Sequence, residues 1–147
     1  TTVLNTPISA IPPPPSTSSS SSNATTAPTI TEAQKNFKAF YNRSICYEQI
    51  NQLHPSLQDI NHAIELQSNH APSFVHRALI HEKLNLLPNA IIDLTKAIQC
   101  GASLVTTLYS RSKIYIKLNN YHKALEDLSR IIETTPQSLT KQPFKDI

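Results

Sequence analysis

Glycine, methionine and tryptophan are scarce or missing in this 147-residue chain, whose single glycine is Gly101. A sheet protein with many tight turns would need more glycine. Its two cysteines, Cys46 and Cys100, lie far apart and form no CxxC pair, so we expect reduced, buried thiols. No apolar run approaches the roughly 20 residues that cross a bilayer, and the N-terminus lacks a secretory signal. These absences predict a cytoplasmic protein, or a nuclear one, with no membrane partner.

Charge is also missing from residues 1–30, which contain no Asp, Glu, Lys or Arg and are rich in Pro, Ser and Thr. Such a composition buries too little apolar surface to fold, so we expect a disordered tail. Pro12 to Pro15 favour polyproline II, as a stiff linker or as a ligand for an aromatic groove. Elsewhere the basic residues are spread along the chain and the net charge is only +3, which argues against a nucleic-acid surface.

The rest of the chain repeats itself every 34 residues, because residues 37–70, 71–104 and 105–138 align without gaps. Three columns of the alignment are invariant: Arg43, Arg77 and Arg111; Asp59, Asp93 and Asp127; Asn51, Asn85 and Asn119. Three columns are apolar: Phe40, Phe74 and Leu108; Ile60, Leu94 and Leu128; Ile64, Ile98 and Ile132. Small residues fill two more: Ser44, Ala78 and Ser112; Ser56, Ala90 and Ala124. These columns indicate three copies of one folding unit.

Each unit reads as two antiparallel helices. Apolar residues follow helical spacing in the first half (Phe40, Cys46, Tyr47, Ile50) and in the second (Leu57, Ile60, Ala63, Ile64). Asn tolerates the left-handed conformation that ends a helix, so the Asn column marks the joint. Pro55 and Pro88 fall in the first turn of the second helix, and Gly101 falls where the middle unit ends. The fold class is therefore all-α.

These units resemble the tetratricopeptide repeat family over about residues 37–138. The third unit matches best, through residues 115–128 and the final Pro136, whereas the first two carry Ser68 and Ala102 in place of that proline. The resemblance implies a right-handed superhelical solenoid of antiparallel helix pairs, whose first helices line a concave groove for a peptide or partner helix. The stacking of hairpins is also expected on physical grounds, because a single hairpin must pack on a neighbour to bury both its faces.

The chain starts with Thr and ends abruptly at Ile147, so we expect a fragment, with residues 139–147 as a truncated extension.

The family geometry implies a set of partner-binding residues on the concave side. They are Tyr41, Asn42, Ile45, Val75, His76, Leu79, Tyr109, Ser110, Lys113 and Lys117. An alternative is that several of them only pack helix against helix. One branch of the family grips the C-terminal carboxylates of chaperone tails with Lys, Asn and Arg, but the matching columns here hold Tyr41, Ile45, His76, Thr106 and Ser110. A two-carboxylate clamp is therefore not expected.

The Arg and Asp columns lie 16 residues apart in each unit. Folding the hairpin near residue 52 leaves them about 3 Å apart in height, at a rise of 1.5 Å per residue, which an Arg side chain can span. We predict structural ion pairs Arg43–Asp59, Arg77–Asp93 and Arg111–Asp127. The competing interpretation has each Arg pointing to solvent, where exposed pairs contribute only about 0–1 kcal/mol.

Nothing in the sequence indicates catalysis or a cofactor. The chain has six histidines, and His54, His62 and His70 are evenly spaced. No pair has the i, i+4 spacing with an acidic partner that a zinc helix would show, so we expect all six at the surface or at helix caps, and no metal. No phosphate-binding loop or nucleophile elbow is present. The leading hypothesis is a protein-interaction scaffold or adaptor. The alternatives are a structural piece of a larger assembly that buries Leu125, Leu128 and Ile132, and the regulatory arm of an enzyme lying outside this chain.

Overall fold

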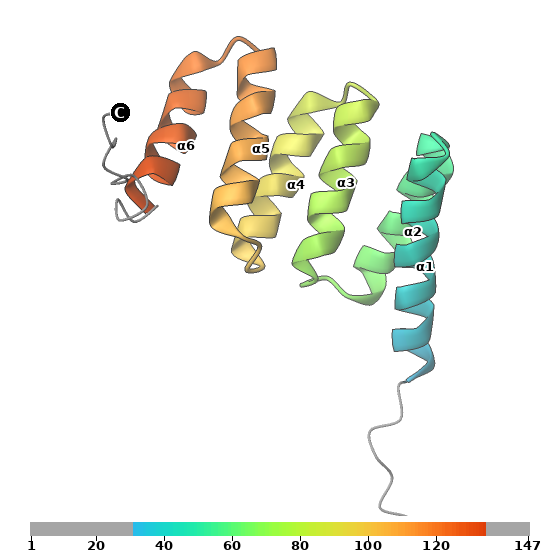
Figure 1. The fold of residues 1–147 in the computed structure, drawn as a ribbon. Helices are drawn as coiled ribbons and strands as arrows, with labels where there is room; N and C mark the ends of the chain where they lie inside the picture. Colours follow the sequence, from blue (N-terminus) through green and yellow to red (C-terminus); the bar gives the residue numbers. More distant parts are fainter. Residues whose placement is uncertain (1–30, 135–147) are drawn as a thin grey trace, which may run out of the picture.

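The computed structural model describes residues 31–134, in which all regular structure is α-helical. The helices are α1 (Glu32–Gln49), α2 (Leu53–Leu66), α3 (Ala71–Lys83), α4 (Leu87–Gln99), α5 (Leu104–Lys117) and α6 (Tyr121–Thr134). They pair as hairpins α1/α2, α3/α4 and α5/α6, and α2 packs on α3 as α4 packs on α5. The hairpins follow one another in a row with α1 and α6 at its ends (Figure 1). The expected tail (1–30), Pro136 and the extension (139–147) lie outside the described residues.

The Asn column ends the first helix of every hairpin, as the sequence predicts. Asn51, Asn85 and Asn119 have φ angles of 60°, 58° and 57°. The next residue then donates its N–H back to the carbonyl five positions earlier, over 2.8 Å in each unit (Gln52 to Tyr47, Leu86 to His81, Asn120 to Tyr115). This is the Schellman motif, which satisfies carbonyls that the helix end leaves free. Gly101, with φ 88°, ends α4 in the same way.

The two columns of small residues mark where the helices of a hairpin approach most closely, and all six side chains are buried. In the first hairpin both positions are serines that bond reciprocally. Ser44 Oγ donates to the Ser56 carbonyl over 2.9 Å, and Ser56 Oγ donates to the Ser44 carbonyl over 2.8 Å. The middle hairpin has Ala78 and Ala90 there. Ser56 therefore keeps the close contact and adds hydrogen bonds to it.

Apolar side chains fill the seams between successive hairpins. Ile60 and Ala63 of α2 pack with Ile80 of α3, and all three are fully buried. Leu94 of α4 packs in the same way with Ile114 of α5. Each seam removes apolar surface from water that one hairpin could not cover alone, which is why the units need one another.

Two sequence expectations about burial are wrong. Cys46 is exposed and Cys100 only half-buried, although both were expected inside. On α1 the buried residues are Phe37, Ser44 and Glu48, while Ile50 of the expected stripe is 63% exposed. For α1 the reason is that it has no preceding hairpin within residues 31–134, so the face that α3 and α5 bury stays open. Cys100 is the C-cap residue of α4, where the helix ends at the turn to α5.

A third correction concerns His81, which was expected at the surface or at a helix cap. It is 8% exposed and its Nδ1 lies 2.8 Å from Asp93 Oδ2. Burial of His81 is tolerated because the Asp93 carboxylate supplies a hydrogen-bond partner.

None of the six described helices is long and apolar enough to cross a membrane.

Candidate functional site

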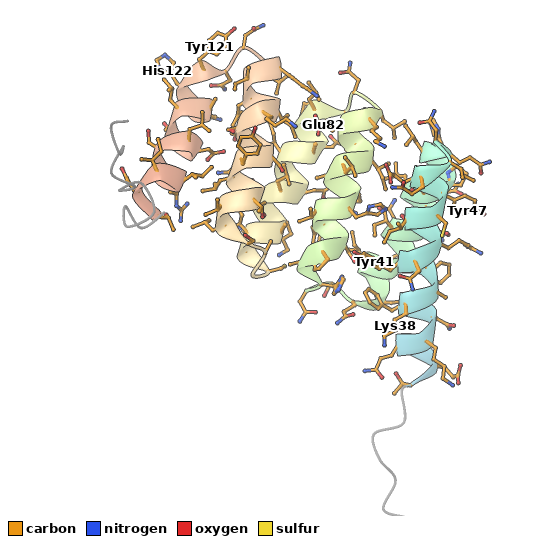
Figure 2. The ribbon with its side chains drawn as sticks, viewed as in Figure 1. Lys38, Tyr41, Tyr47, Glu82, Tyr121 and His122 are labelled. Carbon is orange, nitrogen blue, oxygen red and sulfur yellow. The ribbon has the colours of Figure 1, made fainter. Side chains whose placement is uncertain are left out.

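A groove of about 620 Å³ runs between α3 and α5. It is bounded by Tyr41 of α1 at one side and by the turn between α4 and α5 at its end. Its lining consists of Tyr41, Ala71, Pro72, Val75, His76, Ala78, Leu79, Glu82, Leu94, Gly101, Ala102, Ser103, Thr106, Thr107, Ser110 and Ile114. Figure 2 shows Tyr41 between α1 and α3, and Glu82 near the opposite end of α3.

Helical spacing explains which side chains reach the groove. On α3, Val75, Leu79 and Glu82 are four and then three residues apart, so they lie on one face. Thr106, Ser110 and Ile114 of α5 are spaced by four and form the opposing face. Val75 and Leu79 are 38% and 40% exposed although both are apolar. The groove thus offers accessible apolar surface on α3 opposite hydroxyl groups on α5.

His76 and Tyr41 form the wall of the groove nearest to α1. The His76 ring nitrogen Nε2 lies 3.1 Å from Ser44 Oγ, and the two rings meet edge to face with centroids 6.1 Å apart. Burial lowers the pKa of His76, against an opposing effect of the Glu48 carboxylate, and burial raises the pKa of Tyr41. Both rings are therefore uncharged at neutral pH and offer hydrogen bonds without charge.

Ion pairs join the first helices of neighbouring hairpins beside the groove. Glu48 of α1 pairs with Lys83 of α3, and Glu82 of α3 pairs with Lys117 of α5. The hydrogen bond from Lys83 lowers the pKa of Glu48. The sequence-based prediction places Lys117 against a partner and does not include these pairs. The signal was present, because Glu48 and Glu82 occupy one column of the 34-residue repeat and Lys83 and Lys117 the next.

Half of the predicted partner-binding residues line the groove and half do not. Tyr41, Val75, His76, Leu79 and Ser110 line it; Asn42, Ile45, Tyr109, Lys113 and Lys117 do not. Tyr109 is 57% exposed but points outside the groove lining. On α5 the lining face runs through Thr106 and Ser110, one step around the helix from the expected Tyr109 and Lys113. Glu82, Thr106 and Pro72 are lining residues that the prediction omitted.

The structure brings both members of each predicted Arg–Asp pair together. Arg43 donates Nε and Nη2 to Asp59 over 2.6 and 2.8 Å, and Arg111 donates the same atoms to Asp127 over 2.8 and 2.6 Å. Arg77 Nη2 reaches Asp93 over 2.6 Å. The Asp59 carboxylate raises the pKa of Arg43, chiefly through its hydrogen bonds. These forked contacts match the geometry in which a guanidinium binds a carboxylate best.

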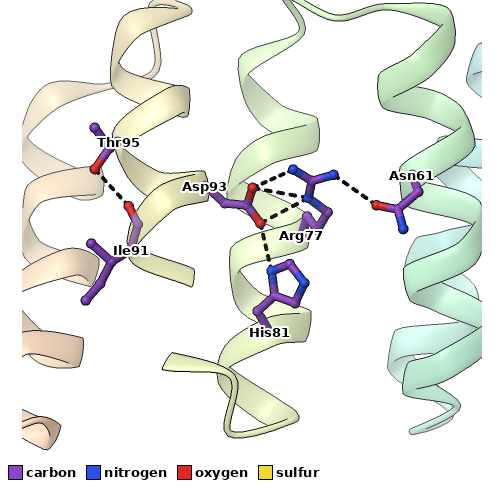
Figure 3. Close-up of polar contacts among 6 residues, drawn as sticks. All are labelled: Asn61, Arg77, His81, Ile91, Asp93 and Thr95. Carbon is purple, nitrogen blue, oxygen red and sulfur yellow. Dashed lines mark hydrogen bonds and ion pairs between the residues drawn. The ribbon is translucent and has the colours of Figure 1, made fainter. Parts of the chain in front are cut away.

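Two of these arginines also tie their hairpin to the preceding one. Arg77 Nη1 donates to Asn61 Oδ1 of α2, and Arg111 Nη1 donates to Thr95 Oγ1 of α4, each over 2.9 Å. Figure 3 shows Arg77 between Asn61 and Asp93, with His81 Nδ1 on Asp93 Oδ2, an oxygen that Arg77 Nε also contacts. Each of these two arginines therefore connects three helices.

Over residues 31–134 there is no group of three His, Cys, Asp or Glu side chains placed to hold a metal ion.

The fold of this chain is similar to that of known tetratricopeptide repeat proteins. A family model described as tetratricopeptide repeat matches residues 105–138. The tetratricopeptide domain of Arabidopsis OM64 is similar in structure with a TM-score of 0.65 and 20% identity, covering 74% of this chain and 89% of that one. No curated protein sequence matches significantly.

Two further solved structures share the fold. The second tetratricopeptide domain of Spaghetti (RPAP3), bound to the HSP90 peptide SRMEEVD, has a TM-score of 0.62 at 16% identity and covers 70% of this chain and 97% of that one. YrrB, described as having an unusual peptide-binding site, has a TM-score of 0.60 at 18% identity and covers 76% of this chain. The match spans only 61% of YrrB.

Proposed function

We propose that the chain is a protein-interaction adaptor that binds an extended segment of a partner in the groove between α3 and α5. This function is typical of its fold, a right-handed superhelical solenoid of three tandem tetratricopeptide repeats. The observation that carries this proposal is the groove itself, where exposed apolar side chains of α3 face hydroxyl groups of α5. Binding sites for extended segments commonly combine such apolar surface with a few hydrogen-bonding groups. Peptide binding in YrrB and in the Spaghetti domain supports the same use of the fold. We assign the chain no catalytic step.

The lining indicates which kind of segment would fit. Among the described lining residues there is no Lys or Arg, and the single carboxylate, Glu82, is paired with Lys117. His76 is neutral because burial lowers its pKa. An acidic tail would lose its hydration without gaining a cation, which is costly. We therefore expect a neutral segment with apolar side chains for Val75 and Leu79, and we expect no two-carboxylate clamp.

A peptide-display selection on the immobilised 147-residue chain tests this function. Leu79→Glu places a carboxylate in the groove at a position that is already 40% exposed, so it should not disturb the core. Ile92→Glu is the matched control, because Ile92 is 67% exposed on α4 and outside the groove lining. Circular dichroism establishes that both variants keep their helices.

We expect the selection to enrich peptides with apolar side chains and few acidic ones. Leu79→Glu should weaken their binding about tenfold or more, because losing the burial of one Leu-sized contact is worth roughly 1.5–3 kcal/mol. Ile92→Glu should bind as the wild type does. Equal binding by all three proteins, or enrichment of acidic C-termini, would contradict the proposal.

A further inference from the structure

The outer face of α6 is an uncovered apolar surface. Tyr121, Leu125, Leu128 and Ile132 are spaced by four, three and four residues, so they form one stripe along the helix. Leu125 is 60% exposed and Ile132 is 67% exposed. We call this stripe, with Ser129 beside it, the α6 face.

The repeat shows what kind of surface this is. The positions of the α6 face are filled in α2 by Leu53, Leu57, Ile60, Asn61 and Ile64, and in α4 by Leu87, Ile91, Leu94, Thr95 and Ile98. Residue type is retained at nearly every position. In α2 and α4 these side chains are buried or half-buried, because α3 and α5 pack against them. The α6 face is therefore a third copy of a surface that twice receives the first helix of the next hairpin.

The complementary surface is also present and open, at the other end of the molecule. Ile80 of α3 and Ile114 of α5 are 0% and 1% exposed because they pack into the preceding hairpin. Cys46 occupies the same column on α1 and is exposed, as is Ile50 one turn further on. Figure 2 shows Tyr47 of the same helix and Tyr121 of α6 at opposite ends of the array. We call Phe40, Arg43, Cys46, Tyr47 and Ile50 the α1 face.

Arg43 is the most specific part of the α1 face. Arg77 and Arg111 each place Nη1 on a side-chain oxygen of the preceding hairpin, at Asn61 and Thr95. Their side chains are 23% and 15% exposed, whereas that of Arg43 is 58% exposed. Within residues 31–134 no acceptor lies on Arg43 Nη1. The third position of the Asn61 and Thr95 column is Ser129 on the α6 face, whose hydroxyl is an acceptor of the same kind.

The charges at the two ends are compatible with contact. Each internal seam carries a Glu–Lys pair, Glu48 with Lys83 and Glu82 with Lys117. At a seam between two copies the Glu position is Ile116 and the Lys position is Gln49. Both are neutral, so this position of the joined seam holds no unpaired charge. A buried charge without a partner would oppose association.

From these observations we propose that the chain self-associates head to tail, with the α6 face of one copy packed on the α1 face of a second copy as α2 packs on α3. Arg43 of the second copy then donates to Ser129 of the first. The contact is heterologous, so each added copy leaves one face of each kind open and the array can grow. Association is weaker than an internal seam, because the chain connection that gives neighbouring hairpins an effective concentration of about millimolar is absent.

Sedimentation velocity of the full 147-residue chain in reducing buffer, over a range of protein concentrations, tests the proposal. Two face variants are needed: Leu125→Lys with Ile132→Lys on the α6 face, and Cys46→Lys with Ile50→Lys on the α1 face. All four side chains are exposed, so folding should persist. Ile92→Lys, 67% exposed on α4, is the matched control.

The wild type and the control should grow in mass with concentration past the dimer, whereas each face variant alone should stay monomeric. An equimolar mixture of the two face variants retains one intact face of each kind, and it should form a one-to-one dimer that grows no further. A wild type that stays monomeric at every concentration overturns the proposal. So does association that only the α6 variant abolishes, which would mean that two α6 faces pair with each other.

Discussion

In the middle hairpin, Arg77 contacts Asp93 on its own unit and Asn61 on the unit before it, and His81 contacts the same carboxylate. In the first hairpin, Arg43 makes hydrogen bonds to Asp59 alone within residues 31–134 and stays 58% exposed. The two arginines occupy one column of the repeat. What separates them is the presence or absence of a covering neighbour, so the worth of an identical ion pair depends on its place in the array.

The largest expected effect comes from removing the two carboxylates in turn. Asp93→Ala leaves Arg77 and His81 without their shared partner, and breaking a buried pair costs about 3 kcal/mol. Asp59→Ala should cost clearly less, because water can solvate Arg43 in its place. Urea unfolding followed by circular dichroism measures both. Equal losses of unfolding free energy in the two variants would contradict this expectation, since they would mean that the covering hairpin does not strengthen the ion pair.

The serine pair gives a smaller effect and concerns the interior of the first hairpin. Ser56→Ala reproduces the small residue that the middle hairpin has at Ala90, but it removes the bond from Ser56 Oγ to the Ser44 carbonyl. We expect a loss of about 1 kcal/mol in the free energy of unfolding. Gln58→Ala, at an exposed position of the same helix, serves as the control. An unchanged midpoint for Ser56→Ala would show that the hydrogen bonds add nothing to close packing.

The smallest expected effect is a pH dependence at the seam between these two hairpins. Burial lowers the pKa of His76 below its ordinary value of 6.5. The unfolded chain therefore binds a proton first as the pH falls, so the contribution of neutral His76 is present above about pH 6.5 and is lost below it. His76→Gln should show a flatter loss of stability between about pH 7 and pH 5.5 than the wild type. The exposed His54→Gln variant should follow the wild type, and a wild-type profile for His76→Gln would refute the assignment.

Much of the fold could be predicted from the sequence, because its determinants are local and repeated. The Asn column predicted three left-handed helix ends, and all three have that conformation. The spacing of 16 between Arg43 and Asp59 predicted a contact across one hairpin, which depends only on helix rise and turn position. The all-α solenoid expected from the 34-residue period is confirmed.

The groove was harder to predict, because its lining depends on how α5 is rotated against α3. Tyr109 and Ser110 are adjacent in sequence and about 100° apart around the helix, and only Ser110 reaches the groove. The apolar stripe of a helix usually shows which of its sides faces the core. On α5, however, apolar residues lie on several sides, so the sequence does not single out one of them. Packing against α4 decides which of them turn inward.

The repeating unit, its joints and its Arg–Asp pairs can therefore be inferred from the amino-acid sequence, because they follow from contacts within 34 residues. Which copies of each column are covered depends on how the hairpins stack in the folded chain. Cys46, Ile80 and Ile114 share a column, yet the first is exposed and the other two are buried. The physical reason is that burial belongs to the array: a side chain leaves water only when the next hairpin supplies the opposing surface, and within residues 31–134 the α1 face and the α6 face have no such neighbour.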